Sequence, residues 1–221
     1  MSLLGFDTST AASSACVLRS DGESFEVAPE AARLTRPPAH ASELMPAVED
    51  VMTRAALDWA ELEAIAVGVG PGAFTGLRIG VATARGLAHA AGLPLRAVSS
   101  LAALAAGIDA DARLAVIDAK RGEVFALLEA PGVYGWEPEA LTPETLAERV
   151  RTSAATPLAA GDGSVRFRQA LETAGISVAP DDAGAHVVRG LHVCRLAQGV
   201  ADEPPEAVLP DYLRAPDAKP Q

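Results

Sequence analysis

Residues 68–80, GVGPGAFTGLRIG, contain five glycines and one proline between an apolar run and a stretch with a helical pattern. So much glycine at one junction indicates that the backbone closely approaches another group. Two kinds of group fit this requirement, a phosphate or another piece of protein. The answer decides between a nucleotide-binding protein and one whose helices pack closely.

The known phosphate-binding templates do not match. A P-loop needs G-x-x-x-x-G-K-[ST], but Gly72 and Gly76 are one residue too close together, and Leu77 and Arg78 follow. The dinucleotide pattern G-x-G-x-x-G fails from either of its two possible starts. Helix N-termini attract anions in any case, and Thr75 is a candidate cap, so a weak anion site stays open as an alternative.

The helix after the glycines offers a second explanation. Gly76, Gly80, Ala84 and Ala88 recur at every fourth residue and therefore share one helix face. Packing of this face on its own sheet is one interpretation. A second amphipathic helix is predicted over 40–57, with Leu44, Val48 and Val51 among its apolar positions. Together the two helices are candidates for half of an intermolecular helix bundle.

Composition limits the function. The 221 residues are 49% hydrophobic and carry a net charge of −11, which disfavours wrapping nucleic acid with the whole surface. A local contact made while a partner grips the nucleic acid remains open. Cys16 and Cys194 are expected to be free buried thiols in a reducing compartment. Because no signal peptide and no apolar run of membrane-spanning length is present, we expect a cytoplasmic protein without membrane contact.

A strand–Asp–turn–strand unit occurs twice, around Asp7 and around Asp118. Each copy is followed by strands and helices in alternation, which predicts an α/β protein of two similar lobes, 1–98 and 99–221. The predicted strands are 3–6, 15–18, 65–69, 113–118, 123–128, 158–160 and 176–178. The predicted helices are 40–57 (with Ser42 as its N-cap), 77–91, 98–107, 142–151, a helix from about 163 to 174, and 184–198. Asp58 has capping-box spacing, and the tail 202–221 is expected to be extended and to pack back on the body, anchored by Tyr212 and Leu213.

Four stretches resemble the bacterial TsaB family, also called YeaZ. They are DTST at Asp7, GPGAFTGLRIGVATARGLA, IDAKRGEVF and PDYLRAPDA. The resemblance implies a two-lobed actin-like, Hsp70-type ATPase fold with duplicated ribonuclease H-like lobes and a degenerate nucleotide site. It also implies a non-catalytic role in forming N6-threonylcarbamoyladenosine on the tRNA adenosine 3′ of the anticodon.

The resemblance implies partners too. They are a TsaD-like transferase, bound through equivalent N-terminal helices, and a TsaE-like ATPase on the complex, with tRNA reached only through the complex. Alone, the chain is expected to form a twofold homodimer. No metal or cofactor is expected, and nucleotide binding would be weak and confined to a partner interface. The residues predicted to bind the partner are Leu44, Val48, Val51, Gly76, Arg78, Gly80, Ala84 and Leu87.

Asp7 and Asp118 end strands where ATPases of this fold place carboxylates near a magnesium nucleotide. Ser9 stands where those ATPases have glycine, and Ala-Lys-Arg follows Asp118, so both positions are interpreted as vestigial. A small kinase or ATPase of the same fold is therefore the weaker alternative. A peptidase is another, but no G-x-S-x-G elbow is present.

The remaining ionisable candidates give weak signals. His40, His89, His186 and His192 show no metal-ligand spacing. The pair Lys120-Arg121 and Arg214 are basic candidates for contact with tRNA or a partner, although solvated surface is the interpretation favoured by composition.

Overall fold

The computed structural model describes residues 1–213, which form two lobes, each built on a five-stranded sheet. In the first sheet the order is β3-β2-β1-β4-β5, with the strands Ser24–Val27, Ser14–Leu18, Leu3–Asp7, Ala64–Gly70 and Leu95–Ser99. In the second it is β10-β9-β6-β7-β8, with Ser177–Val178, Leu158–Ala160, Arg113–Lys120, Glu123–Glu129 and Glu139–Leu141.

The two sheets share one topology. In each, the first strand in sequence is central, pairs antiparallel with the second, and pairs parallel with the fourth. The third and fifth strands then lie at opposite edges. The twofold repeat predicted around Asp7 and Asp118 is confirmed, since these residues lie on β1 and β6, the equivalent central strands.

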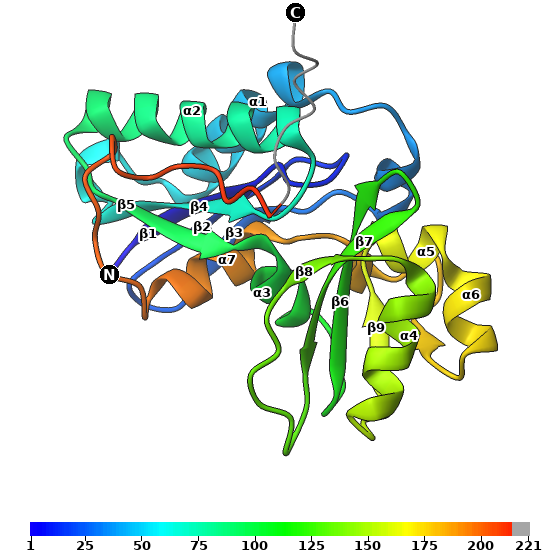
Figure 1. The fold of residues 1–221 in the computed structure, drawn as a ribbon. Helices are drawn as coiled ribbons and strands as arrows, with labels where there is room; N and C mark the ends of the chain where they lie inside the picture. The colour runs from blue at the N-terminus through cyan, green and yellow to red at the C-terminus, as the bar shows by residue number, and fades with distance from the viewer. Residues whose placement is uncertain (214–221) are drawn as a thin grey trace, which may run out of the picture.

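The helices cover the sheets in layers. On the first sheet, α1 (His40–Ala55) and α2 (Phe74–Ala91) lie on the face turned away from the second lobe (Figure 1). The outer face of the second sheet packs against α4 (Pro143–Thr152) and α6 (Arg168–Thr173), while α5 (Asp162–Arg166) lies against β6.

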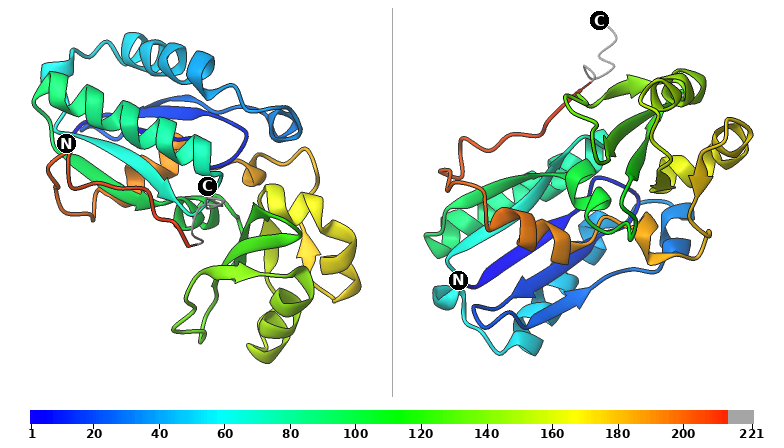
Figure 2. Two further views of the ribbon diagram at one scale, coloured as in Figure 1. Left: turned by 45° about the horizontal axis from the view of Figure 1, so that its top comes forward. Right: turned by 90° about the horizontal axis from the view of Figure 1, so that it is seen from below.

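Two helices connect the lobes. α3 (Ser100–Ala105) follows the first sheet but packs against β6 and β7, and α7 (Gly190–Ala197) follows the second sheet but packs against β1 and β2. One hydrophobic core therefore contains residues of both sheets, such as Leu3 and Ile117. The division predicted at residues 98 and 99 needs correction, because α7 and the segment after it return to the first lobe (Figure 2).

Several predicted boundaries differ from the structure. Strands β3, β5 and β8 were not predicted, and the helix predicted over 184–198 is a short 3-10 helix η3 (Gly184–His186), an extended linker and then α7. Ser42 is not an N-cap; Ala39 occupies that position, and Ser42 Oγ donates to the Ala39 carbonyl at 3.0 Å. The capping box at Asp58 is present, but it opens a 3-10 helix η2 (Trp59–Glu61).

Two further observations limit the possible sites. Within residues 1–213, no helix combines the length and the apolar character required to cross a membrane. Over the same residues, no cluster of three or more His, Cys, Asp or Glu side chains has the arrangement of a metal site. Cys16 and Cys194 are free and buried, as predicted, and burial raises the pKa of the Cys194 thiol.

Candidate functional site

Asp7 ends β1 in a closed network of hydrogen bonds. Its Oδ1 accepts from the Ser9 amide at 2.7 Å and from Ser9 Oγ at 2.6 Å, and its Oδ2 accepts from Ser100 Oγ at 2.6 Å. Only 1% of Asp7 is exposed, and burial raises the pKa of its carboxyl despite these hydrogen bonds. The carboxylate is fully occupied by protein donors.

The glycine-rich stretch completes this network. The Gly70 amide donates to Ser100 Oγ at 3.1 Å, which links the stretch to Asp7 through one hydroxyl. A Cβ on Gly68 would lie closer than 3.0 Å to the Asp7 carboxylate. The stretch thus wraps the strand-end carboxylate instead of leaving it open to a ligand.

The same stretch packs against the loop that follows Asp7. The Ala73 amide donates to the Ser9 carbonyl at 2.7 Å, and Thr8 Oγ1 donates to the Gly76 carbonyl at 2.8 Å. A Cβ on Gly76 or on Gly80 would lie closer than 3.0 Å to Thr8. The close approach predicted from the glycines is therefore to this chain's own loop, and Thr75 lies within the first turn of α2 after an N-cap at Ala73.

This packing corrects the predicted partner surface. Leu44, Val48 and Val51 are at most 1% exposed and pack against the first sheet, as does Ala84. Gly76 and Gly80 face Thr8. Of the eight predicted residues, Arg78 remains exposed and Leu87 half-buried. The apolar and small faces chosen from the sequence are the faces that the lobe needs for its own core.

The opposite side of α2 is open. Arg78, Ala82, Gly86 and Ala90 are exposed at four-residue spacing, so they lie along one outward face. Gly86 has open space where a Cβ would be built. Half-buried Ile79 and Leu87 flank this row. We call this set the outward face of α2; within the exposed row itself, Arg78 alone has a long side chain.

Asp118 occupies the position in β6 equivalent to that of Asp7 in β1, but its carboxylate has charged partners. Its Oδ2 pairs with Lys120 Nζ at 2.8 Å and with an Arg166 guanidinium nitrogen at 2.7 Å. Burial alone would raise the pKa of Asp118, but the hydrogen bonds from Lys120 and Arg166 outweigh it and lower the pKa. Both cations are half exposed or more, whereas the Asp118 side chain itself is 6% exposed, so a buried carboxylate is paired with cations that extend into solvent.

A cavity of about 950 Å³ lies between the lobes. Its walls come from the loop after β1, the 3-10 helix η1 (Ala31–Thr35), the turn after β6, and α5. Asp118, Lys120 and Arg166 line it, whereas Asp7 does not, because Ser9 stands between. Asp162 also lines the cavity, and burial raises the pKa of its carboxyl.

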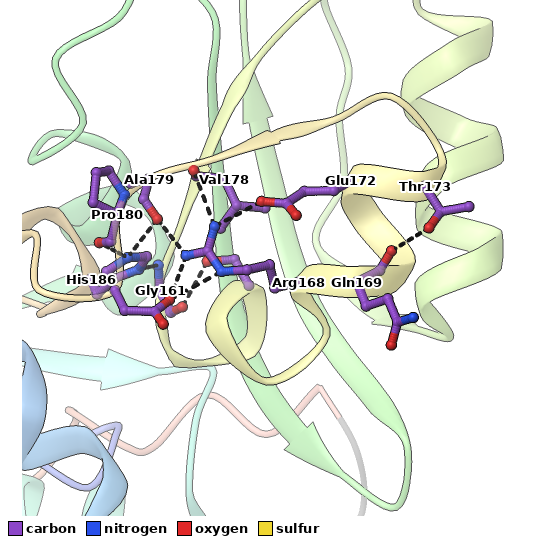
Figure 3. Close-up of polar contacts among 11 residues, drawn as sticks. Gly161, Arg168, Gln169, Glu172, Thr173, Val178, Ala179, Pro180 and His186 are labelled. Atoms are coloured by element: carbon purple, nitrogen blue, oxygen red, sulfur yellow. Dashed lines mark hydrogen bonds and ion pairs between the residues drawn. The ribbon is translucent and has the colours of Figure 1, made fainter.

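Two histidines, His40 and His186, form hydrogen bonds within the chain. His186 accepts from the Gly161 amide at Nδ1 (3.0 Å) and lies 2.8 Å from the Pro180 carbonyl at Nε2, as Figure 3 shows. Arg168 lies beside it and donates to the Ala179 carbonyl at 2.5 Å. His40 Nδ1 bonds to Ser13 Oγ at 2.8 Å, and burial together with the Arg33 charge lowers its pKa.

Sequence reasoning missed two residues of these networks. Ser100 joins Asp7 to Gly70, and Arg166 pairs with Asp118 across 48 positions. Neither has a local sequence signal, because each acts on a group brought near by the fold. The basic candidate Lys120 proves to be a partner of Asp118, whereas Arg214 lies outside the described residues.

Comparisons with known proteins agree with one another. A family model described as TsaD, tRNA N6-adenosine threonylcarbamoyltransferase, matches residues 27–152. The tRNA threonylcarbamoyladenosine biosynthesis protein TsaB of Escherichia coli is 36% identical over 175 residues, covering 74% of this chain and 72% of that protein. YeaZ from Pseudomonas aeruginosa superposes with a TM-score of 0.75 at 29% identity, covering 96% of this chain and 99% of that one.

A transferase is also among the relatives. The tRNA N6-adenosine threonylcarbamoyltransferase of Erythrobacter litoralis is 46% identical over 63 residues, which is 28% of this chain and 18% of that protein.

Proposed function

Since this chain belongs to the TsaB (YeaZ) family, we propose that it is a non-catalytic subunit in the biosynthesis of threonylcarbamoyladenosine on tRNA. It binds a TsaD-like transferase and thereby scaffolds and activates that enzyme. The transferase carries the threonylcarbamoyl group to N6 of the tRNA adenosine 3′ of the anticodon. A TsaE-like ATPase acts on the same complex.

The outward face of α2 is the observation that carries this proposal. Ala82, Gly86 and Ala90 present almost no side chain to solvent, and Ile79 and Leu87 supply apolar edges. A helix with small residues on its exposed side lets a second helix approach closely, which increases the packing contact between them. The inward face of the same helix is already occupied by Thr8 and the first sheet.

The partner is expected to share the fold. The transferase family model matches residues 27–152, a range that includes both α1 and α2. A partner of that family would carry helices equivalent to α1 and α2, so the two chains can pair through matching elements. The same surface is self-complementary, and a twofold homodimer is expected when the partner is absent.

The two strand-end carboxylates support a non-catalytic role. Asp7 is buried behind Ser9, and Asp118 is neutralised by Lys120 and Arg166. Neither is available to hold a magnesium ion on a nucleotide without breaking existing bonds. We therefore expect nucleotide binding to be weak and confined to a partner interface, and the arrangement weighs against the kinase or ATPase alternative.

The negative net charge of the chain supports a model in which the partner binds the tRNA. With a net charge of −11, the chain alone repels a polyanion at physiological salt. Contact with tRNA is expected only within the complex.

The test is reconstitution with the transferase, the TsaE-like ATPase and tRNA. We expect no threonylcarbamoyladenosine from this chain alone and a large increase in product when it joins the others. Gly86→Glu adds a charge to the outward face of α2 without crowding this chain's own atoms. Burying that charge in the interface should weaken transferase binding about 100-fold, with the unfolding midpoint unchanged.

Ala170→Glu is the matched control, since Ala170 is an exposed helical alanine on α6 in the other lobe. It should bind and activate as the natural chain does. Unchanged product formation by Gly86→Glu would reject the proposed surface, and product made by this chain alone would reject the non-catalytic role.

A further inference from the structure

The segment 202–213, which we call the C-terminal strap, is fastened along the first sheet. Arg96 Nε donates to Asp202 at 2.7 Å, and Glu203 exchanges backbone hydrogen bonds of 2.8 and 2.9 Å with Leu95 on β5. Val208 is buried in the core beneath α1 and α2. The Asp211 amide then donates to the Val69 carbonyl at 2.8 Å on β4. The strap runs on the side of α2 opposite α1 (Figure 2).

The end of the strap exposes apolar side chains. Among the described residues, four large hydrophobic side chains are exposed, and three of them lie within five residues of the strap: Leu209, Tyr212 and Leu213, at 64%, 36% and 37%. The fourth, Tyr134, is in the loop between β7 and β8 of the other lobe. Scattered apolar residues are ordinary on a surface, but a cluster on a segment fastened at both ends indicates an interaction site.

Tyr212 joins this cluster to the outward face of α2. Its ring lies 5.1 Å from the Phe74 ring, and its hydroxyl accepts from Arg78 Nε at 3.1 Å. The Arg78 guanidinium in turn lies 3.8 Å above the Phe74 ring. Arg78 begins the outward row of α2, so the strap end and that row form one continuous surface.

The outward face of α2 is small for a stable complex. An 18-residue helix is about 27 Å long and about 10 Å wide, so one face of it covers roughly 270 Å², less than the roughly 800 Å² that each partner buries in a standard interface. On one side α2 is bordered by α1, whose exposed residues are mostly polar or charged, such as Ser42, Glu49 and Thr53. On the other side lies the apolar end of the strap. The added area is therefore best supplied by the strap.

We propose that Leu209, Tyr212 and Leu213 form the second part of the docking surface for the TsaD-like transferase, with Arg78 as the bridge between the two parts. The inference rests on the proposed function, since it takes the transferase as the occupant. The strap is held to the first lobe by backbone hydrogen bonds and by Val208, so its exposed side chains are presented to the partner on a rigid support.

The experiment titrates the purified transferase with the full chain carrying Leu209→Ser and Leu213→Ser together. Leu209 is 64% exposed and Leu213 37%, so the unfolding midpoint should change little while the dissociation constant rises about tenfold or more. Tyr134→Ser is the matched control for removing an exposed apolar side chain, and it should bind as the natural chain does. Tyr212→Phe keeps the ring on Phe74 and should weaken binding less than the double variant.

Three outcomes overturn the inference. Affinity within twofold of the natural chain rejects the strap as a contact, and the proposed function stands if Gly86→Glu still weakens binding about 100-fold. Weaker self-association with unchanged transferase affinity makes a second copy of this chain the occupant. Failure of the natural chain to bind the transferase rejects the proposed function itself.

Discussion

The strand–Asp–turn–strand units around Asp7 and Asp118 share one sequence pattern, but their aspartates lie in different environments. Around Asp7 the donors of Ser9 and Ser100 and the backbone of Gly68 surround the carboxylate, and Gly76 and Gly80 of α2 pack against Thr8 in the next loop. Asp118 is also buried, but it lines the cavity between the lobes and pairs with the half-exposed or exposed cations Arg166 and Lys120. The same position in two equivalent sheets is thus a packing centre in one lobe and a buried ion pair at the cavity in the other. The difference teaches that the glycine-rich stretch packs the first lobe around Asp7 and Thr8, whereas the second lobe has ion pairs at the equivalent position.

Gly76→Val should cause the largest loss of stability, by disrupting the packing of α2 on the loop after Asp7. The new side chain would collide with the Thr8 carbonyl and press on His40 Nε2, which is 3.1 Å from the Cβ position. Overpacking against backbone should cost about 4 kcal/mol or more of unfolding free energy, measured by urea denaturation. Gly86→Ala on the outward face is the control and should stabilise the helix by up to about 1 kcal/mol. Equal changes in unfolding free energy for the two variants would contradict the assignment of a buried face and an exposed face to α2.

Replacing each aspartate by alanine compares the units directly. Asp7→Ala leaves the Ser9 amide and the hydroxyls of Ser9 and Ser100 buried without their acceptor, at a cost of about 3 kcal/mol. Asp118→Ala releases Lys120 and Arg166 to water and should cost about 1 kcal/mol. Denaturation midpoints of the two variants measure the difference, and an Asp118 effect as large as that of Asp7 would contradict the comparison.

The pH dependence of stability should have opposite signs at the two sites. The folded pKa of Asp7 is raised, so the folded state holds its proton more tightly, and stability falls as pH rises from the unfolded pKa to the folded pKa. The folded pKa of Asp118 is lowered, so its contribution is present above the unfolded pKa and is lost as pH falls through the folded value.

Unfolding free energies from about pH 3 to 7, compared with Asp7→Asn and Asp118→Asn, separate the two contributions. The first variant should remove the decline with rising pH and the second the loss on acidification. If stability changed with pH in the same direction at both sites, burial would determine the pKa shift of both carboxylates.

Arg166→Gln should have the smallest effect. The guanidinium is half exposed, and Lys120 remains to neutralise Asp118. We expect a loss of about 0.5 kcal/mol that shrinks as salt is added, seen in thermal unfolding at two ionic strengths. A loss of stability that does not change with salt would show that Arg166 contributes by packing and not by its ion pair with Asp118.

Much of the architecture followed from local pattern. The repeated strand–Asp–turn–strand unit predicted two lobes, and the topologies of the two sheets agree. Strand β5 was missed because Arg96 interrupts its apolar run; in the structure the arginine is stabilised there by Asp202 of the strap and by the Ala197 carbonyl. The final helix was predicted too long because the apolar residues of the extended linker before α7 fit a helical period equally well.

The sequence by itself determined that α2 carries small residues at four-residue spacing and that something packs closely against them. It could not choose the face, because Gly76, Gly80 and Ala84 on one side and Ala82, Gly86 and Ala90 on the other have the same period. Only the tertiary structure decided which face is buried, because there the row that begins at Gly76 packs against Thr8 and the first sheet. Periodicity fixes which residues share a face, whereas burial depends on contacts between segments far apart in the chain.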